Sequence, residues 1–359
     1  MKRFKSIALA AFAVIVAVGV IAPTFGASVA SAQSNGSAAL SIVPKKNYVI
    51  EPGKSVDDTL VIRNLDTTQE LNLNMRVIDF TFTGNGGTPK LFLDTNAAQT
   101  TWSLKPFLSV PKTVKVSPGQ SKTVNMSVKI PANQGAGSYY SAIIYSTGAD
   151  EGGNVGLSAS GVTLVFTTVP GKVNEDLKLK KLGAYDANKQ GDLSGYKYLW
   201  DKQPENIAYT LQNNGNVTEA PVGNIKLKGW FGKEYNIDDV NPSGSLALIG
   251  QTRTYTACIK LATSDVNVGG SSAPANTCAN PGLWPGYYRV SLDVFYGQNG
   301  NNTQEVTGTA SFWYLPLWFV VTFFVILLIL ALVVWRLVVR IRKAVYGPKY
   351  RKSSVNRRR

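Results

Sequence analysis

Hydrophobic and polar residues alternate with a period of two through most of the chain between residues 40 and 312. The runs are rich in Val, Ile, Thr, Tyr and Phe, and clusters of Gly, Asn, Asp and Pro separate them. This alternation predicts β-strands with one face on a core, because side chains two residues apart share a face. No window shows the period of an amphipathic helix. We therefore expect an all-β fold of immunoglobulin-like sandwiches.

One strand pattern is written twice, as GQSKTVNMSVKIP from Gly119 and as GQTRTYTACIKLA from Gly250. The alternation assigns every other residue of each copy to the core. The predicted inward residues are Val124, Met126, Val128 and Ile130 in the first copy, and Tyr255, Ala257, Ile259 and Leu261 in the second. The predicted outward residues are Thr123, Asn125, Ser127 and Lys129, and then Thr254, Thr256, Cys258 and Lys260.

A second element also repeats, as AGSYYSAIIYST from Ala136 and as PGYYRVSLDVFYG from Pro285. Aligning the glycine of each copy places Tyr139 on Tyr288. A Gly-x-Tyr that opens a sandwich strand predicts a tyrosine corner, in which the hydroxyl bonds to nearby backbone. Strands ending in Asn-rich turns recur around Asn64 and Asn213. The repeats predict two sandwiches, residues 37–170 and 172–311.

Two cysteines, Cys258 and Cys278, bracket most of an insert found only in the second copy. The aligned glycines of the two elements are 18 residues apart in the first copy (Gly119 and Gly137) and 36 apart in the second (Gly250 and Gly286). An even cysteine count in an exported chain predicts a disulfide. We expect it to tie a long flexible loop to its strand, at about 3 kcal/mol of chain entropy.

The two ends of the chain have the features of targeting and membrane segments. Residues 1–32 combine basic residues, an apolar run and a small-x-small site, which predicts a secretory signal peptide; an uncleaved anchor is the alternative. The 19 residues from 317 to 335 carry no charge, so we expect a transmembrane helix over residues 313–335. The predicted membrane-interface residues are Trp313, Trp318, Trp335, Arg336 and Arg340.

The basic charge at the ends sets the expected topology. Of the 37 Lys and Arg residues, 13 lie at the two ends, which leaves 24 against all 22 acidic residues for the rest. The net charge of +15 therefore predicts no nucleic-acid partner. Basic residues stay cytoplasmic, so we expect a single-pass plasma-membrane protein with its N-terminus outside and a basic cytoplasmic tail, residues 336–359. The lipid bilayer is a predicted partner.

The residue types leave little room for catalysis. The chain has no histidine, which excludes Ser-His-Asp and Cys-His catalysis and His-ligated zinc. Adjacent acids such as Asp57 and Asp58 point to opposite faces of a strand and do not converge. We therefore expect no enzyme, no cofactor and no strong metal site. DANKQGDLSG from Asp186 has the spacing of half a calcium loop, but Lys197 stands where a Glu ligand would complete it; a plain turn is preferred, with weak calcium binding left open.

Some segments have more than one interpretation. GNGG (84–87) and EGGNVG (151–156) predict hairpin loops. The strand AGSYYSAIIYS is apolar on both faces, so it is either covered on its outer face or is a contact surface. Trp102, Phe107 and Trp230 are expected in the core. The prolines of TTWSLKPFLSVP predict a sheet edge.

The segment from Leu40 to Thr147, with its Pro-Gly-x-Ser turns and late Gly-x-Tyr, resembles the first domain of the WxL-interacting cell-surface proteins of Gram-positive bacteria. That resemblance implies an immunoglobulin-like domain related to the N-terminal domain of periplasmic pilus chaperones, and peptidoglycan binding. It also implies the observed order of signal peptide, two β domains, membrane helix and basic tail. The second domain, NIAYTLQNNGNVTEAPVGNIKLKGWFG, departs from the family pattern, and so does its insert.

These observations predict a non-catalytic, membrane-anchored bacterial cell-surface protein that binds a cell-wall polymer or another surface protein. One alternative is a membrane-tethered, chaperone-like assembly factor that lends a strand edge to an exported subunit. An exposed hydrophobic edge would favour it, and a charged or Pro-interrupted edge would argue against it. The other alternative is an accessory subunit of an envelope complex. The sequence predicts no particular ligand or oligomeric state.

Overall fold

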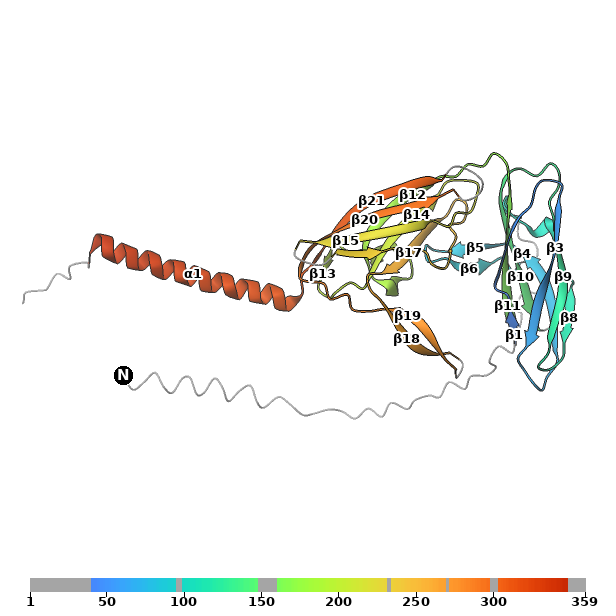
Figure 1. The fold of residues 1–359 in the computed structure, drawn as a ribbon, viewed down its shortest axis with the longest axis horizontal. Helices are drawn as coiled ribbons and strands as arrows, with labels where there is room; N and C mark the ends of the chain where they lie inside the picture. Colours follow the sequence, from blue (N-terminus) through green and yellow to red (C-terminus); the bar gives the residue numbers. More distant parts are fainter. Residues whose placement is uncertain are drawn as a thin grey trace, which may run out of the picture. The chain divides into compact units, whose positions relative to one another are not determined.

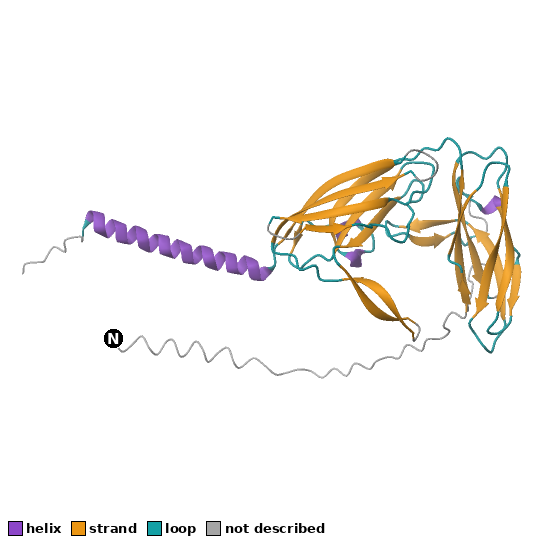
Figure 2. Cartoon of the chain, viewed as in Figure 1, coloured by secondary structure: helices purple, strands orange, loops and turns teal. Residues whose placement is uncertain are grey.

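The structure, a computed structural model, describes residues 40–94, 99–147, 160–230, 234–268, 271–297 and 303–347. Within these residues the chain forms two β-sandwiches followed by one helix (Figure 1). The all-β class is therefore confirmed, and strands dominate the chain (Figure 2). The predicted signal peptide, the 151–156 loop and residues 348–359 of the predicted tail lie outside the described residues.

The first sandwich pairs a sheet of order β1-β3-β9-β7 with a sheet of order β2-β11-β10-β4-β8, and carries a β5–β6 hairpin whose turn is the predicted 84–87 loop. Its strands are β1 (Leu40–Ile42), β2 (Lys45–Val49), β3 (Ser55–Asn64), β4 (Leu71–Ile78), β5 (Phe80–Thr83), β6 (Thr88–Leu91), β7 (Leu108–Ser109), β8 (Thr113–Val116), β9 (Ser121–Lys129), β10 (Gly137–Ser146) and β11 (Ser160–Val169). The predicted inward residues of the first repeat are all buried.

The second sandwich pairs a sheet of order β12-β14-β17 with a sheet of order β13-β21-β20-β15-β16. Its strands are β12 (Leu177–Tyr185), β13 (Leu199–Trp200), β14 (Asn206–Asn213), β15 (Val222–Gly229), β16 (Glu234–Ile237), β17 (Thr252–Cys258), β20 (Gly286–Tyr296) and β21 (Gln304–Tyr314). A separate hairpin joins β18 (Leu261–Val268) to β19 (Ser271–Cys278). Residues between Val169 and Leu177 connect the two sandwiches.

The sequence repeat is a structural repeat, and both predicted tyrosine corners form. The Tyr139 hydroxyl donates to the backbone oxygen of Gly135 at 2.9 Å, and the Tyr288 hydroxyl donates to that of Trp284 at 2.8 Å. In both cases the acceptor lies four residues before the tyrosine. The glycine that opens each strand, Gly137 or Gly286, has a φ near 150° that side chains rarely adopt, which explains why glycine stands there twice.

The repeated asparagines are buried, and their side chains hold the two Asn-rich turns in place. Asn64 and Asn213 are each fully buried. The Asn64 side-chain amide donates to the backbone oxygens of Gln69 and Val116, and its oxygen accepts from the Asp66 N–H. Asn213 makes the equivalent set of three bonds in the second sandwich. Each asparagine thereby links backbone groups of its own turn to the backbone of a neighbouring segment, Val116 in the first sandwich and Ala247 in the second.

The outer face of β10 is covered, which settles the interpretation of the strand that is apolar on both faces. Tyr140, Ala142 and Ile144 are buried in a cluster with Phe80 of the β5–β6 hairpin. Leu248, from the second sandwich, belongs to the same cluster, and Trp102 packs against it. Phe107 packs against the core of the first sandwich. Trp230 differs from the expectation, because its side chain is 64% exposed and not in a core.

The insert of the second sandwich is an ordered hairpin and not the expected flexible loop. Cys258 and Cys278 form the predicted disulfide, with Cα atoms 5.1 Å apart. Because β18 begins at Leu261, that residue leaves the plane of the preceding strand and is 60% exposed, so its predicted inward position is wrong. Thr254, expected to face outward, is buried because its hydroxyl donates to the Gly191 backbone oxygen at 3.0 Å.

The end of the second sandwich differs from the predicted boundary. Strand β21 runs to Tyr314, three residues past residue 311, so Trp313 lies in a strand and not at the start of the helix. Only Leu315 and Pro316 separate β21 from helix α1 (Leu317–Tyr346). The helix continues past the apolar stretch and ends at Gly347, whose φ of 62° suits glycine.

Candidate functional site at the edge of β9

The sheet β1-β3-β9-β7 has an incomplete edge. Strand β7 is only two residues long and pairs Leu108 with Val128 and Ser109 with Ser127. Continuing this pairing would place Pro111 opposite Asn125. Proline has no N–H to donate, so the ladder stops before it. The predicted sheet edge is confirmed here, and most of β9 has no described strand partner on this side.

The backbone of β9 presents hydrogen-bonding groups at this open edge. The Ile130 N–H donates to the Lys54 backbone oxygen, and the Asn64 N–H donates to the Gln120 backbone oxygen. The backbone N–H and C=O groups of the even-numbered residues of β9 therefore point toward β3. Bonding directions alternate along an antiparallel strand. The N–H and C=O groups of Thr123 and Asn125 therefore point away from β3, toward the open edge.

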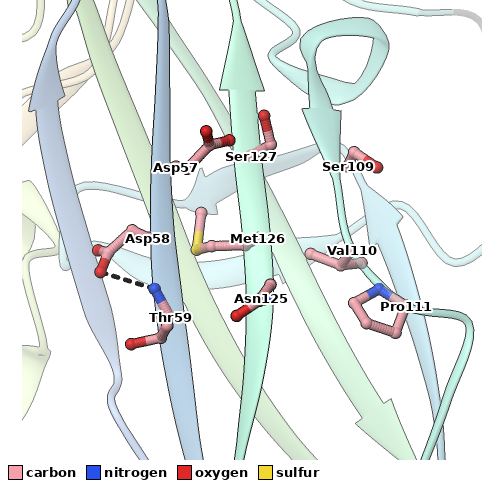
Figure 3. A pocket seen from close by; sticks show the side chains of 9 residues that line it. All are labelled: Asp57, Asp58, Thr59, Ser109, Val110, Pro111, Asn125, Met126 and Ser127. Atoms are coloured by element: carbon pink, nitrogen blue, oxygen red, sulfur yellow. Dashed lines mark hydrogen bonds between the residues drawn. The ribbon is translucent and has the colours of Figure 1, made fainter.

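The residue of β3 that lies opposite Asn125 supports this assignment of bonding directions. Thr59 lies opposite Asn125, yet its N–H donates to the Asp58 carboxylate at 2.7 Å, drawn as a dashed line in Figure 3. The pair therefore belongs to the positions whose backbone groups do not bond across the β3–β9 ladder.

A groove of about 670 Å³ follows this edge (Figure 3). Asp57, Ser127 and Ser109 form a row across three strands, which we call the polar row. Val110 and Pro111 form the opposite, more apolar wall where the chain leaves the sheet. Hydroxyl and carboxylate groups thus line one end of the groove, and Asn125, on the unpaired part of β9, lies toward Pro111 at the other end (Figure 3).

Asp57 and Asp58 point to opposite faces, as the strand period predicts. Both residues line the groove, but the Asp58 side chain also joins the two sheets of the sandwich. Its carboxylate accepts from Lys46 Nζ at 2.7 Å and from the Tyr48 hydroxyl at 2.5 Å. Hydrogen bonds from Lys46, from Tyr48 and from the Thr59 N–H lower the pKa of Asp58 to about 2. Burial, together with the Asp58 carboxylate, raises the pKa of Tyr48.

We expect this cluster to make the first sandwich sensitive to acid. The folded-state pKa of Asp58 lies below its ordinary value of 3.8, so its stabilisation is complete above about pH 4 and is lost as the pH falls through 2. The shift corresponds to at most about 2.5 kcal/mol, which screening of a side chain that is 34% exposed reduces to about 1 kcal/mol. Urea unfolding measured across this range should show the loss in the wild type and not in Asp58→Asn. Asp57→Asn is the matched control, and an unchanged slope in Asp58→Asn would contradict the assignment.

The other sequence candidates have structural roles. Asp186 and Asp192 accept backbone N–H bonds, from Asn188 at 3.2 Å and Ser194 at 2.7 Å, and so cap two 3-10 turns. No group of three metal-ligating side chains occurs in the part of the chain that the structure describes. Trp318 and Trp335 are exposed on α1, near the two ends of its apolar stretch, and Arg336 and Arg340 follow on the same helix.

The comparisons with known proteins are limited to architecture. No protein-family model matches the chain, and no curated protein matches it. Among solved structures, the chain is similar to a chaperone–tip adhesin complex of CFA/I fimbriae biogenesis (10% identity, 77% of this chain, 99% of that chain, TM-score 0.34). It is also similar to the class 5 fimbriae chaperone CfaA (14% identity, 77% of this chain, 100% of that chain, TM-score 0.31). A third similar structure is the E. coli chaperone DraB (13% identity, 74% of this chain, 97% of that chain, TM-score 0.31). TM-scores this low establish no common fold, so the sandwich assignment rests on the strand pairing itself.

Proposed function

We propose that this chain is a non-catalytic, membrane-anchored envelope protein whose first sandwich captures an extended segment of another exported protein. The open edge of β9 is the observation on which the proposal depends. An incoming strand can pair with the outward N–H and C=O groups of Thr123 and Asn125, in the space that β7 leaves vacant after Ser109. Main-chain pairing supplies affinity for an extended segment.

The character of the edge limits what the site binds. Thr123 and Asn125 are polar and exposed, Lys122 is exposed beside them, and Pro111 interrupts the neighbouring strand. Such an edge resists uncontrolled pairing with aggregation-prone strands. It therefore argues against a general holder of hydrophobic subunits and favours a partner whose segment complements a polar groove.

The anchoring part of the proposal rests on α1. The helix is long and apolar enough to cross a membrane, with a mean hydropathy of 3.2 in its most apolar part, none of which is buried. At 1.5 Å per residue its 30 residues span about 45 Å, more than the roughly 30 Å of a hydrocarbon core. Arg336 and Arg340 follow the apolar stretch, which favours a cytoplasmic C-terminus and two external sandwiches.

A wall polymer is the second candidate ligand, and the polar row favours it. Asp57, Ser127 and Ser109 offer a carboxylate and two hydroxyls to a ligand rich in hydroxyl and amide groups. The two candidates differ in what they require of the site. Strand capture uses the backbone of β9, whereas polymer binding uses these side chains.

Co-sedimentation with the cell's own envelopes tests the proposal. We would use residues 38–316, which keep all of β21; none of the apolar part of α1 is buried against the sandwiches. The chain is expected to sediment with untreated envelopes and to remain in solution after the envelopes are treated with protease. Binding that survives protease would contradict strand capture and support the wall polymer. No binding in either case would overturn both.

A further inference from the structure

Three neighbouring strands of the second sandwich, β15, β20 and β21, place aromatic side chains in one row at the end of their sheet, and β13 adds a leucine beside it. Leu199 of β13 lies opposite Trp313 of β21, and Trp313 lies opposite Tyr287 of β20. Trp230, just after β15, donates its backbone N–H to the Tyr287 oxygen at 3.2 Å. The three rings, which we call the aromatic row, contact one another with centroids 5.4 to 5.6 Å apart.

Part of this row and several residues around it are exposed. Trp230 is 64% exposed and Leu199 is 60% exposed, whereas Tyr287 and Trp313 are half-buried. Tyr198 and Trp284, at the same end of the sheet, are also mostly exposed. A contiguous apolar surface of this kind indicates a contact surface, since leaving it in water forgoes roughly 25 cal/mol for each Å².

The connection to α1 fixes where this surface lies along the chain. Only Leu315 and Pro316 separate β21 from the helix, and the Leu315 N–H is bonded to the Trp200 oxygen of the sandwich at 2.8 Å. Two extended residues span about 7 Å. The headgroup layer on each side of a bilayer is about 5 to 8 Å thick. If α1 crosses the membrane, the aromatic row therefore lies at headgroup depth, where Trp and Tyr are enriched.

Charged residues follow on the same strands, two residues further from the helix, where long basic side chains can reach back toward headgroup phosphates. Lys228 and Arg289 lie opposite each other, two residues beyond Trp230 and Tyr287 and thus on the same face. Lys226 lies two residues before Lys228 in β15 and so on the same face. Glu234 of β16 lies opposite Lys228 and is the acidic neighbour of these three basic residues. Three cations against one acid favour contact with anionic lipid.

We propose that the aromatic row, with Lys228 and Arg289, seats the second sandwich on the outer surface of a bilayer that contains anionic headgroups. The inference rests on the membrane crossing of α1 proposed above. The chain then has a second contact with the membrane besides its helix. The two-residue linker and this contact together hold the sandwich at a fixed height, as a rigid base and not a domain on a flexible stalk.

The test uses the full chain reconstituted into vesicles of phosphatidylcholine and phosphatidylglycerol, in which part of the phosphatidylcholine is brominated near the headgroup end of its acyl chains. Bromine quenches tryptophan fluorescence on contact. Trp318 and Trp335 report the helix, Trp230 and Trp313 report the row, and Trp284 reports the same end of the sheet. Trp230→Phe, at an exposed position that the fold tolerates, is expected to remove about a fifth of the quenched intensity, as one of these five tryptophans. Trp102→Phe, in the first sandwich, is the matched control and should remove none.

The outcomes separate this inference from the proposed membrane crossing. If Trp230→Phe leaves the quenched intensity unchanged while Trp318→Phe lowers it, the helix crosses and the row touches a protein or water, which would overturn the seating. If no variant changes the quenched intensity because none is quenched, the crossing itself fails and the seating with it. Lys228→Gln combined with Arg289→Gln should lower the Trp230 contribution about twofold in the same vesicles, whereas a purely apolar contact would be unaffected.

Discussion

Asn125→Pro is expected to weaken binding of residues 38–316 to the cell envelope by tenfold or more, whereas Asn125→Ala should change it by less than about twofold. Proline removes the N–H that an incoming strand would use and places a ring in its path. Alanine removes only the side chain and leaves the backbone of β9 intact. A tenfold loss equals about 1.4 kcal/mol, the contribution of roughly one backbone hydrogen bond and its packing.

The two variants are matched because both should fold. The N–H of Asn125 points away from β3, so its loss removes no bond of the β3–β9 ladder. Proline is tolerated where an edge strand turns its N–H outward. Circular dichroism and the unfolding transition would verify this before binding is compared by co-sedimentation.

A different result would change the proposed ligand. An equal loss of binding in Asn125→Pro and Asn125→Ala would place recognition in the side chain, which both variants lack, and would support the wall polymer. In that case Asp57→Asn and Ser127→Ala, in the polar row, should weaken binding as well. Full binding by every variant would move the site away from this groove.

Features that depend on short segments of sequence could be predicted. The inward set of the first repeat follows from period two alone, and each tyrosine corner spans only four residues, between Tyr139 and Gly135 or Tyr288 and Trp284. The disulfide was predictable because two cysteines in a chain that is predicted to be exported have one possible pairing. These features need no knowledge of which strands become neighbours.

Features that depend on which strands become neighbours could not be predicted. The prolines of residues 100–111 predicted a sheet edge, but not that β9 is the strand whose backbone stays open there, because that depends on β7 ending after Ser109 beside β9. The aromatic row likewise needs β15, β20 and β21 to be adjacent. In the sequence, Trp230 and Trp313 are 83 residues apart and each resembles an ordinary core aromatic.

The misplaced end of the second sandwich has a similar physical cause. The residues Phe312, Trp313 and Tyr314 are apolar, and so is the helix that follows, so hydropathy shows no break between them. Only the alternation of burial separates the two, because Phe312 and Tyr314 are buried while Trp313 faces outward. In the insert, small residues and a proline suggested a loop, yet pairing from Leu261 to Cys278 made a hairpin.

Asn213→Ala is expected to destabilise the second sandwich by about 3 kcal/mol, the largest effect we predict for a single truncated side chain. The Asn213 amide donates to the Val217 oxygen at 2.7 Å and to the Ala247 oxygen at 2.9 Å, and its oxygen accepts from the Gly215 N–H at 2.9 Å. Because Asn213 is fully buried, alanine leaves these groups without their partner. The Ala247 oxygen still accepts a hydrogen bond from the Glu219 N–H in the variant. The expected loss of unfolding free energy is therefore about 3 kcal/mol and not larger.

Asn214→Ala is the matched control, because it removes the same side chain one position along the turn. Asn214 is exposed, and its amide makes a longer bond of 3.3 Å to Asp176. Its truncation should change the unfolding free energy by less than about 0.5 kcal/mol. Denaturant unfolding of residues 38–316 would compare the two, and equal effects would show that the turn is held by its backbone alone.

Asn64→Ala should destabilise the first sandwich by a similar free energy, because the repeated asparagine makes the same three bonds there. A loss of stability in only one sandwich would mean that the two asparagines share their bonding geometry but not its contribution to stability.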